Sequence, residues 1–433
     1  MITGKETAAL LRFIDESPTA FHAVENIAGR LEKEGFVRLR EEDQWAPEAG
    51  KGYFVTRNHS SIIAFRMPER KADRFLIAAS HTDSPMFKLK NNALSPSAGA
   101  YLRLNTEVYG GTILSSWLDR PLSVAGRVIL SENGKFTTRL VNIDRDLLVI
   151  PNVAIHFNRT VNSGYAYNPA VDLLPVFSEK PDGSLNALIT DALGCGEDRI
   201  AGADLFVYNR ARGTVIGADG EFFMAPRIDN LMCAHGTLSG FLRARTPSAV
   251  TVYYAADNEE TGSATKQGAA SVFLSDVLDR ICESTETDKR RALASSMMVS
   301  ADNGHAKHPN HPELSDAQNA PYLNRGVVIK TNAAQKYTTD GISAAVFSEI
   351  CQRAKVPVQW FANRSDMPGG STLGSISNTQ VPLMTVDIGM AQLAMHSACE
   401  TAGSADPEFL ADAMKAFYSS ELSCSGDGSF TLS

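Results

Sequence analysis

At 433 residues the chain is longer than one ordinary domain, for which about 150 residues is a typical length. Hydrophobic residues make up 43% and charged residues 21% of it, which is typical of globular proteins and argues against a disordered or fibrous chain. The excess of 49 Asp and Glu over 41 Lys and Arg gives a net charge of −8, which argues against a nucleic acid or an anionic membrane as partner.

The start of the chain carries no recognisable leader. Residues 1–6 lack a basic region followed by an apolar stretch, and the sequence contains no apolar run of about 18 residues that would span a membrane. We therefore expect a cytoplasmic protein. The six cysteines are widely spaced without a Cys-x-x-Cys pair, which predicts reduced thiols and leaves histidines and carboxylates as ligands for any metal ion.

Residues 5–34 predict two helices. Apolar residues recur at helical spacing on either side of Ser17-Pro18-Thr19, and we expect Ser17 or Thr19 to cap the second helix. Three apolar runs, at residues 52–57, 61–65 and 74–80, then predict strands separated by short polar turns.

A histidine and an aspartate follow the third of these strands, in His81-Thr82-Asp83-Ser84-Pro85. Because open α/β sheets build their sites at the carboxyl ends of strands, we interpret His81 as a metal ligand. Asp83 would orient the imidazole or fix an adjacent part of the site. A turn histidine capped by an aspartate is the alternative that these residues alone leave open.

From about residue 91 to 226, Gly-rich and β-branched segments with turn signals between them replace the helical periodicity. This change predicts an inserted β-rich domain. His156 lies within it, in an apolar run that predicts a strand. Its sequence context alone indicates a packed or surface histidine.

Carboxylates mark the segments after the insertion. Asp229 stands near the start of a helix predicted from residue 226, where a simple helix cap is the alternative to a ligand. The apolar run 249–256 predicts a buried strand that leads directly into Asp257-Asn258-Glu259-Glu260. Adjacent carboxylates in such a place are costly unless a cation or a proton-transfer role keeps them there. An Ala- and Ser-rich helix is predicted next, at residues 265–282.

The remaining pattern predicts alternating strands and helices. Strands are expected at residues 295–300, 325–332, 356–361 and 381–389, helices at 341–354 and 406–422, and a weakly ordered tail from residue 423. Asp302 follows the first of these strands and Lys330 stands near the end of the second. Tyr337 precedes a helix, and His396 lies in a loop.

Six side chains stand at strand ends, helix starts or loops of regions that predict one shared sheet, namely His81, Asp229, Glu259, Glu260, Asp302 and His396. Five imidazole and carboxylate ligands with one free carboxylate suit two divalent ions such as zinc. In two-metal hydrolases one carboxylate bridges the ions, and an unligated glutamate moves the proton. Since neighbouring side chains on an extended backbone point opposite ways, one of Glu259 and Glu260 should bind metal and the other act as base.

Five motifs occur in the order in which the aspartyl aminopeptidase family of two-zinc metallopeptidases has them, and the chain resembles that family. They are His81-Thr82-Asp83-Ser84-Pro85, Arg227-Ile228-Asp229-Asn230, Asp257-Asn258-Glu259-Glu260-Thr261-Gly262-Ser263, Asp302-Asn303-Gly304-His305-Ala306 and Ala394-Met395-His396-Ser397. The resemblance implies an α/β metallopeptidase-type catalytic domain, residues 1–90 and 227–433, with a central mixed sheet flanked by helices. A β-rich dimerisation domain, residues 91–226, would interrupt it, and the subunits would form a tetrahedral dodecamer built from dimers.

The same resemblance assigns roles in the metal site. Asp229 would bridge two divalent ions per subunit, Zn²⁺ with Co²⁺ or Mn²⁺ as alternatives. Glu260 and His396 would complete one site, and His81 and Asp302 the other. Glu259 becomes the general base, and we group Asp83 with it as a catalytic residue.

The substrate contacts implied by the resemblance are His156, reaching a neighbouring subunit's site, together with His305, Lys330 and Tyr337. Lys330 suits an acidic side chain or a peptide carboxylate, and a structural ion pair is the alternative. Asn303-Gly304 stands where relatives have Met-Ala, and His311 follows Pro309-Asn310 where an aromatic residue is common; both departures bear on the acidic preference.

We therefore expect an aminopeptidase that removes an N-terminal Asp or Glu from peptides. The same chemistry with a preference for neutral N-terminal residues is the closest alternative. A non-catalytic assembly protein on this fold is disfavoured, because all six site positions carry competent side chains.

Overall fold

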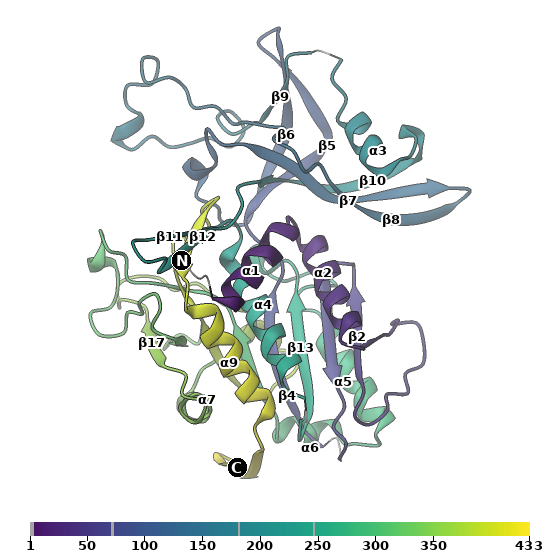
Figure 1. Cartoon of the computed structure of the whole chain (residues 1–433), viewed down its shortest axis with the longest axis vertical. Helices are drawn as coiled ribbons and strands as arrows, with labels where there is room; N and C mark the ends of the chain where they lie inside the picture. Colours follow the sequence, from purple (N-terminus) through teal and green to yellow (C-terminus); the bar gives the residue numbers. More distant parts are fainter. Residues whose placement is uncertain (1–3, 71–72, 181, 246) are drawn as a thin grey trace.

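The computed structural model describes residues 4–70, 73–180, 182–245 and 247–433, and Figure 1 shows them in two parts. One part is an α/β unit around a mixed nine-stranded sheet. The other is an antiparallel six-stranded sheet with a short helix, drawn above the first in Figure 1. The predicted fold class is confirmed. Residues 1–3, part of the segment on which the expectation about a leader rests, lie outside the described residues.

The nine-stranded sheet forms the centre of the α/β part. Across the sheet its strands are β1 (Val37–Arg38), β2 (Gly52–Arg57), β3 (Ser61–Arg66), β13 (Val250–Ala256), β4 (Phe75–His81), β14 (Met297–Ala301), β18 (Met384–Gly389), β16 (Val327–Thr331) and β17 (Val358–Ala362). The four neighbours β13, β4, β14 and β18 are parallel. Their carboxyl ends therefore meet at one edge of the sheet.

The sequences of such central strands are continuous apolar runs because both faces of the sheet are covered. All seven residues of β4 and all seven of β13 are buried. The register pairs Ala256, the last residue of β13, with His81, the last residue of β4. The chain segments that follow the two strands consequently start side by side.

Helices cover both faces of the sheet. The helices are α1 (Lys5–Glu16), α2 (Ala20–Lys33), α3 (Leu185–Leu193), α4 (Ile228–Arg243), α5 (Phe273–Ser284), α6 (Lys289–Ala294), α7 (Gly341–Arg353), α8 (Leu373–Ser377) and α9 (Asp406–Ser419). One apolar core joins the sheet to α1, α2, α4, α7 and α9, and a second core on the other face includes α5, α6 and α8. The break at Ser17-Pro18-Thr19 separates α1 from α2 as predicted. Thr19 occupies the N-cap position, but its side chain makes no capping hydrogen bond and contacts His22 Nδ1 instead.

The antiparallel part has its own core, to which α3 contributes. Its strands, in order across the sheet, are β8 (Lys135–Asn142), β7 (Leu122–Glu132), β10 (Ile200–Asn209), β5 (Met86–Ser97), β6 (Tyr101–Tyr109) and β9 (Val176–Ser178). A smaller sheet within the α/β part consists of β11 (Thr214–Ile216), β12 (Phe222–Ala225), β20 (Glu400–Gly403), β19 (Ala391–Leu393) and β15 (Gly304–His305).

Two predictions of helix and tail structure in the α/β part are wrong. The helix expected at 265–282 begins only at Phe273, because Gly268 lies in a turn so tight that a side chain there would meet Ser263 O at 2.2 Å. The tail from residue 423 is a hairpin of β21 (Leu422–Gly426) and β22 (Ser429–Leu432), held by the packing of Phe430 and Leu432 against the main core.

None of the helices in the described ranges combines the length and the apolar character needed to cross a membrane.

Candidate metal centre

The parallel strand ends deliver three of the expected ligands to one edge of the sheet. His81 is the last residue of β4, Asp302 directly follows β14, and Glu260 lies in the 3-10 turn (Glu259–Thr261) that comes soon after β13. Asp229 stands at the start of α4, and His396 comes from the loop between β19 and β20. The five residues originate in five segments far apart in the sequence.

His81, Asp229 and Asp302 form one compact group. The His81 Nε2 atom lies 3.6 Å from Asp229 Oδ1 and 3.8 Å from Asp302 Oδ1, and all three residues are buried. The His81 Nδ1 atom faces Asp83 instead, at 3.1 Å from its backbone oxygen. This contact favours the tautomer that protonates Nδ1, so that the Nε2 lone pair points into the group.

Asp229, Glu260 and His396 form a second group. The His396 Nε2 atom lies 3.4 Å from Asp229 Oδ2 and 3.5 Å from Glu260 Oε2. Its Nδ1 atom is 2.9 Å from the backbone oxygen of Gly111, which again leaves Nε2 for a ligand role. Asp229 thus offers one carboxylate oxygen to each group, and in each group the ligand atoms lie within 4.8 Å of one another.

The chemistry of these residues fits divalent cations. Asp229 Oδ1 and Glu260 Oε1 are buried and have no hydrogen-bond partner among the described residues. Buried carboxylate oxygens are normally paired or bound to a cation. Burial and the nearby Asp229 raise the pKa of Glu260, so anionic charge here is unfavourable without a compensating cation. The helix-cap alternative for Asp229 does not hold, because Arg227 occupies the N-cap of α4 and the buried Asp229 Oδ1 has no hydrogen-bond partner among the described residues.

Glu259 lies beside the two groups, and its local geometry corrects one premise of the sequence argument. The Glu259 and Glu260 backbone is not extended, because Asn258 adopts a left-handed conformation (φ 61°) and starts the 3-10 turn. Burial raises the pKa of Glu259 to about 8, and neighbouring carboxylates such as Asp302 oppose its ionisation further. A third group of His81, Glu259 and Glu260 also meets the spacing for a metal ion, so geometry alone permits Glu259 as a ligand.

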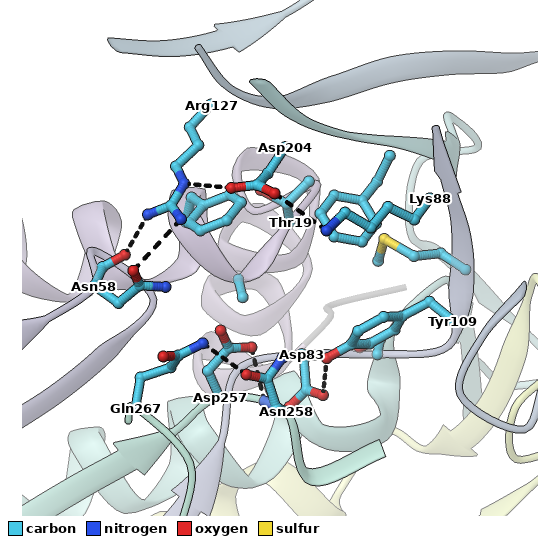
Figure 2. Close-up of a pocket in the computed structure, with 15 residues that line it drawn as sticks. Thr19, Asn58, Asp83, Lys88, Tyr109, Arg127, Asp204, Asp257, Asn258 and Gln267 are labelled. Atoms are coloured by element: carbon cyan, nitrogen blue, oxygen red, sulfur yellow. Dashed lines mark hydrogen bonds and ion pairs between the residues drawn. The ribbon is translucent and has the colours of Figure 1, made fainter. Parts of the chain in front are cut away.

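Asp83 connects His81 to the glutamate pair. Besides its contact with His81, its Oδ1 accepts a hydrogen bond from the backbone N–H of Glu259 and its Oδ2 from that of Glu260, both at 3.2 Å. Figure 2 shows Asp83 with Tyr109 and Asn258 on one side of a cavity of about 110 Å³. Asp83 thus fixes the backbone of the turn that carries both glutamates.

Three expected substrate contacts lie near Asp302. His305 lines a cavity of about 280 Å³ together with Phe361, Gln392 and Ala394. Lys330 is only 2% exposed, and its Nζ donates to the backbone oxygen of Asn303 at 3.0 Å. That Nζ also lies 5.3 Å from the centroid of the Tyr337 ring. Although burial disfavours the charge of Lys330, Asp302 nearby raises its pKa.

His156 is not brought to the site within one chain. The strand predicted around it is a loop, and His156 is exposed between the exposed apolar residues Ile155 and Phe157, the latter 88% exposed. The strand prediction failed because apolar residues in this run face outward instead of lining a core.

The sequence alone assigned no role to several residues that shape the centre. The Tyr109 hydroxyl forms hydrogen bonds with both Asp83 and Asn258. Glu400 is buried, and its carboxylate accepts hydrogen bonds from the backbone N–H of Asp229 at 3.0 Å and of His396 at 2.7 Å. Burial raises the pKa of Glu400 to about 8, and Asp229 adds to the shift. An isolated Glu in a polar context carries no periodic pattern that could have revealed this role.

Comparisons with known proteins agree on one group of relatives. The family described as "Aminopeptidase I zinc metalloprotease (M18)" matches residues 13–418. A protein of Clostridium novyi named "Probable M18 family aminopeptidase 2" is 46% identical over 422 residues, covering 94% of this chain and 97% of that protein. Among solved structures, the chain is similar to that in "Cryo-EM structure of the Ape4 and Nbr1 complex", with a TM-score of 0.93 and 34% identity over 97% of this chain and 88% of that one. It is also similar to the S. cerevisiae mApe1 dodecamer, with a TM-score of 0.84 and 25% identity over 96% of each chain.

Proposed function

Because the chain belongs to the M18 family of zinc aminopeptidases, we propose that it removes an N-terminal Asp or Glu from peptides with the help of two zinc ions per subunit. Membership makes it a zinc-dependent hydrolase and confirms the resemblance to aspartyl aminopeptidases. The observation that carries the two-ion proposal is the position of Asp229. Its two carboxylate oxygens face two different histidines, at 3.6 Å from His81 and 3.4 Å from His396.

In this proposal His81, Asp229 and Asp302 hold one ion, and Asp229, Glu260 and His396 hold the other. Bound zinc supplies a Lewis acid that polarises the peptide carbonyl and makes water a better nucleophile near neutral pH. The protein orients the ligands: Asp83 and the Gly111 carbonyl set the two imidazoles, and Glu400 fixes the backbone of Asp229 and His396.

Glu259 is the proposed general base. Its carboxylate takes a proton from the attacking water and returns the proton to the leaving amine. Cationic charge next to Glu259 favours the ionised form that this role needs, opposing the effect of burial. The backbone bond from Glu259 N–H to Asp83 holds the base at the edge of the ligand groups.

For the acidic preference we propose Lys330, with His305 and Tyr337, as contacts of the substrate. A buried ammonium group whose pKa is raised stays charged and can attract a carboxylate. The alternative preference, for neutral residues, is supported by the bond that Lys330 already donates to the Asn303 carbonyl. An acidic substrate would have to reach a lysine that is almost fully covered.

We further propose that the subunit works in a homo-oligomer, a tetrahedral dodecamer built from dimers through the inserted domain at residues 91–226. The similar S. cerevisiae protein is a dodecamer. The exposed apolar residues around His156 favour burial against another copy, and His156 would then enter the neighbouring subunit's site. A cytoplasmic location is part of the same proposal.

The test is a series of matched dipeptides with N-terminal Asp, Glu, Leu or Lys, incubated with protein whose zinc content has been measured. We expect about two zinc ions per subunit and a higher kcat/KM for Asp and Glu. Equal rates on Leu would refute the acidic preference. Less than about one ion per subunit after gentle purification would count against the two-metal centre.

A further inference from the structure

The antiparallel part of the molecule contacts the proposed metal centre through residues 109–113, which start at the last residue of β6; we call them the 109–113 segment. Its first residue, Tyr109, packs edge-on against Phe206 of the same part, with 5.6 Å between ring centroids. Figure 2 shows the Tyr109 hydroxyl directed toward Asp83, along one side of the cavity between the two parts.

The Tyr109 hydroxyl joins two groups of the α/β part. It donates to Asp83 Oδ2 at 2.7 Å and accepts from Asn258 Nδ2 at 2.8 Å. Asn258 is held from its other side, since its Oδ1 accepts from Gln267 Nε2 at 2.7 Å and from Thr265 Oγ1 at 2.9 Å. The phenol therefore closes a chain of hydrogen bonds from the 264–268 loop to Asp83.

Both partners of Tyr109 control the turn that carries the glutamates. The carboxylate of Asp83 accepts hydrogen bonds from the backbone N–H groups of Glu259 and Glu260. Asn258 adopts the left-handed conformation from which the turn starts. Moving either partner would shift the carboxylates of Glu259 and Glu260 together.

The next residues of the segment contact Glu260 and His396, two members of the second ligand group. Gly110 has φ +73°, and a side chain there would meet Glu260 Cβ at 3.1 Å, so only glycine allows this close approach. The backbone oxygen of Gly111 accepts a hydrogen bond from His396 Nδ1 at 2.9 Å, and Thr112 Oγ1 donates one to His396 O at 3.1 Å. The backbone N–H of Ile113 donates to the same His396 oxygen at 2.9 Å.

The two ligand groups differ in what supports them. His81 and Asp302 are fixed by β4 and β14, which are neighbouring central strands. Glu260 and His396 lie in a turn and a loop, and both are contacted by the 109–113 segment. The antiparallel part therefore contacts the second group directly. It reaches the first group only indirectly, because Tyr109 bonds to the carboxylate of Asp83, whose backbone oxygen lies near His81 Nδ1.

We propose that Tyr109 is a positioning residue through which the antiparallel part sets the Asp229, Glu260 and His396 site and the orientation of Glu259. The inference rests on the proposed two-zinc function and adds a residue to it. Groups that orient metal ligands through hydrogen bonds typically contribute about 10- to 100-fold in metal affinity or activity.

The test compares Tyr109→Phe, which removes only the hydroxyl, with Tyr208→Phe as a matched control. Tyr208 lies on β10, and its hydroxyl donates to Asn142 Oδ1 at 2.7 Å within the antiparallel part. The dissociation constants of both zinc ions are measured on the full-length assembly by competition with a chromogenic chelator. The kcat and KM for an Asp dipeptide are then determined at saturating zinc.

For Tyr109→Phe we expect one zinc dissociation constant to rise about 10- to 100-fold while the other stays within about 3-fold. We also expect kcat to fall by a similar factor with KM nearly unchanged, and Tyr208→Phe to match the wild type in all four quantities. Thr112→Val removes the side-chain bond to His396 O and the bond accepted from Trp117 Nε1. It should weaken the same zinc site, and it tests the role of the 109–113 segment if Tyr109→Phe does not fold.

Wild-type values for Tyr109→Phe, or equal losses in Tyr208→Phe, would overturn the inference while leaving the proposed function intact. A wild-type protein that binds fewer than two zinc ions or does not hydrolyse peptides would overturn the proposed function, and this inference with it.

Discussion

Replacement of Glu259 by glutamine separates proton transfer from metal binding at the centre. Gln keeps the size of the side chain, and the backbone N–H of residue 259 still donates to Asp83 at 3.2 Å, so the turn should persist. Loss of a general base typically lowers the rate by about 10²- to 10⁴-fold. We expect the upper half of this range, about 4 to 5 kcal/mol in transition-state free energy. The carboxylates of Asp229, Glu260 and Asp302 are assigned as ligands, and both oxygens of Asp83 accept backbone hydrogen bonds, so none is free to replace Glu259.

The assay measures kcat and KM on an Asp dipeptide together with zinc per subunit by mass spectrometry. For Glu259→Gln we expect about two zinc ions and almost no turnover. Glu260→Gln serves as the comparison, because it changes a ligand of the His396 group and should lower the content toward one ion per subunit.

The opposite pattern would refute the reasoning. The group formed by His81, Glu259 and Glu260 makes such an outcome physically accessible. If Glu259→Gln lost a zinc ion while Glu260→Gln retained both and lost turnover, the two glutamates would have exchanged roles.

Three further predictions concern other parts of the molecule. His156→Ala and Glu259→Gln subunits, each inactive alone, should regain some activity when mixed, and no recovery despite confirmed subunit exchange would make His156 a within-chain residue. Lys330→Met should lower kcat/KM about 10- to 100-fold for Asp dipeptides and much less for Leu dipeptides, and equal losses would mean that the lysine does not read the substrate side chain. Glu6→Gln should destabilise the metal-free protein by about 1 to 3 kcal/mol at pH 7, because the hydrogen bond with His235 holds the pKa of Glu6 near 2, below its ordinary 4.5. The stabilisation by ionised Glu6 is complete above pH 4.5 and is lost as the pH falls toward 2, so the variant's melting temperature should change less than that of the wild type across this window.

Much of the sheet could be predicted because its central strands are long apolar runs with polar residues at their ends. The run 249–256 became β13, and 74–80 became β4 with a shift of one residue. Strand ends in a parallel sheet converge, so the proximity of His81, Asp302 and the glutamate pair followed from the pattern alone. The pairing of Ala256 with His81 is the register that makes this happen.

The failures share a physical cause, which is that local composition does not report what lies opposite a segment in space. Apolar residues around His156 predicted a strand, yet they are exposed in a loop. The Ala- and Ser-rich residues 265–272 form turns because Asn258 takes hydrogen bonds from two of their side chains. The role of Tyr109 could not be predicted for the same reason, since its partners Asp83 and Asn258 are distant in sequence.

The place where the antiparallel part joins the rest has a consequence for modularity. The chain leaves the central sheet at His81, enters β5 at Met86, and comes back through β10, which ends at Asn209, before reaching Asp229. A domain-deletion fragment would therefore carry its artificial junction within a few residues of His81, one of the proposed metal ligands, and would lose the carbonyl next to His396 Nδ1. The α/β part is an incomplete module, because a protein shortened to it would lack the 109–113 segment that contacts two of its proposed ligands.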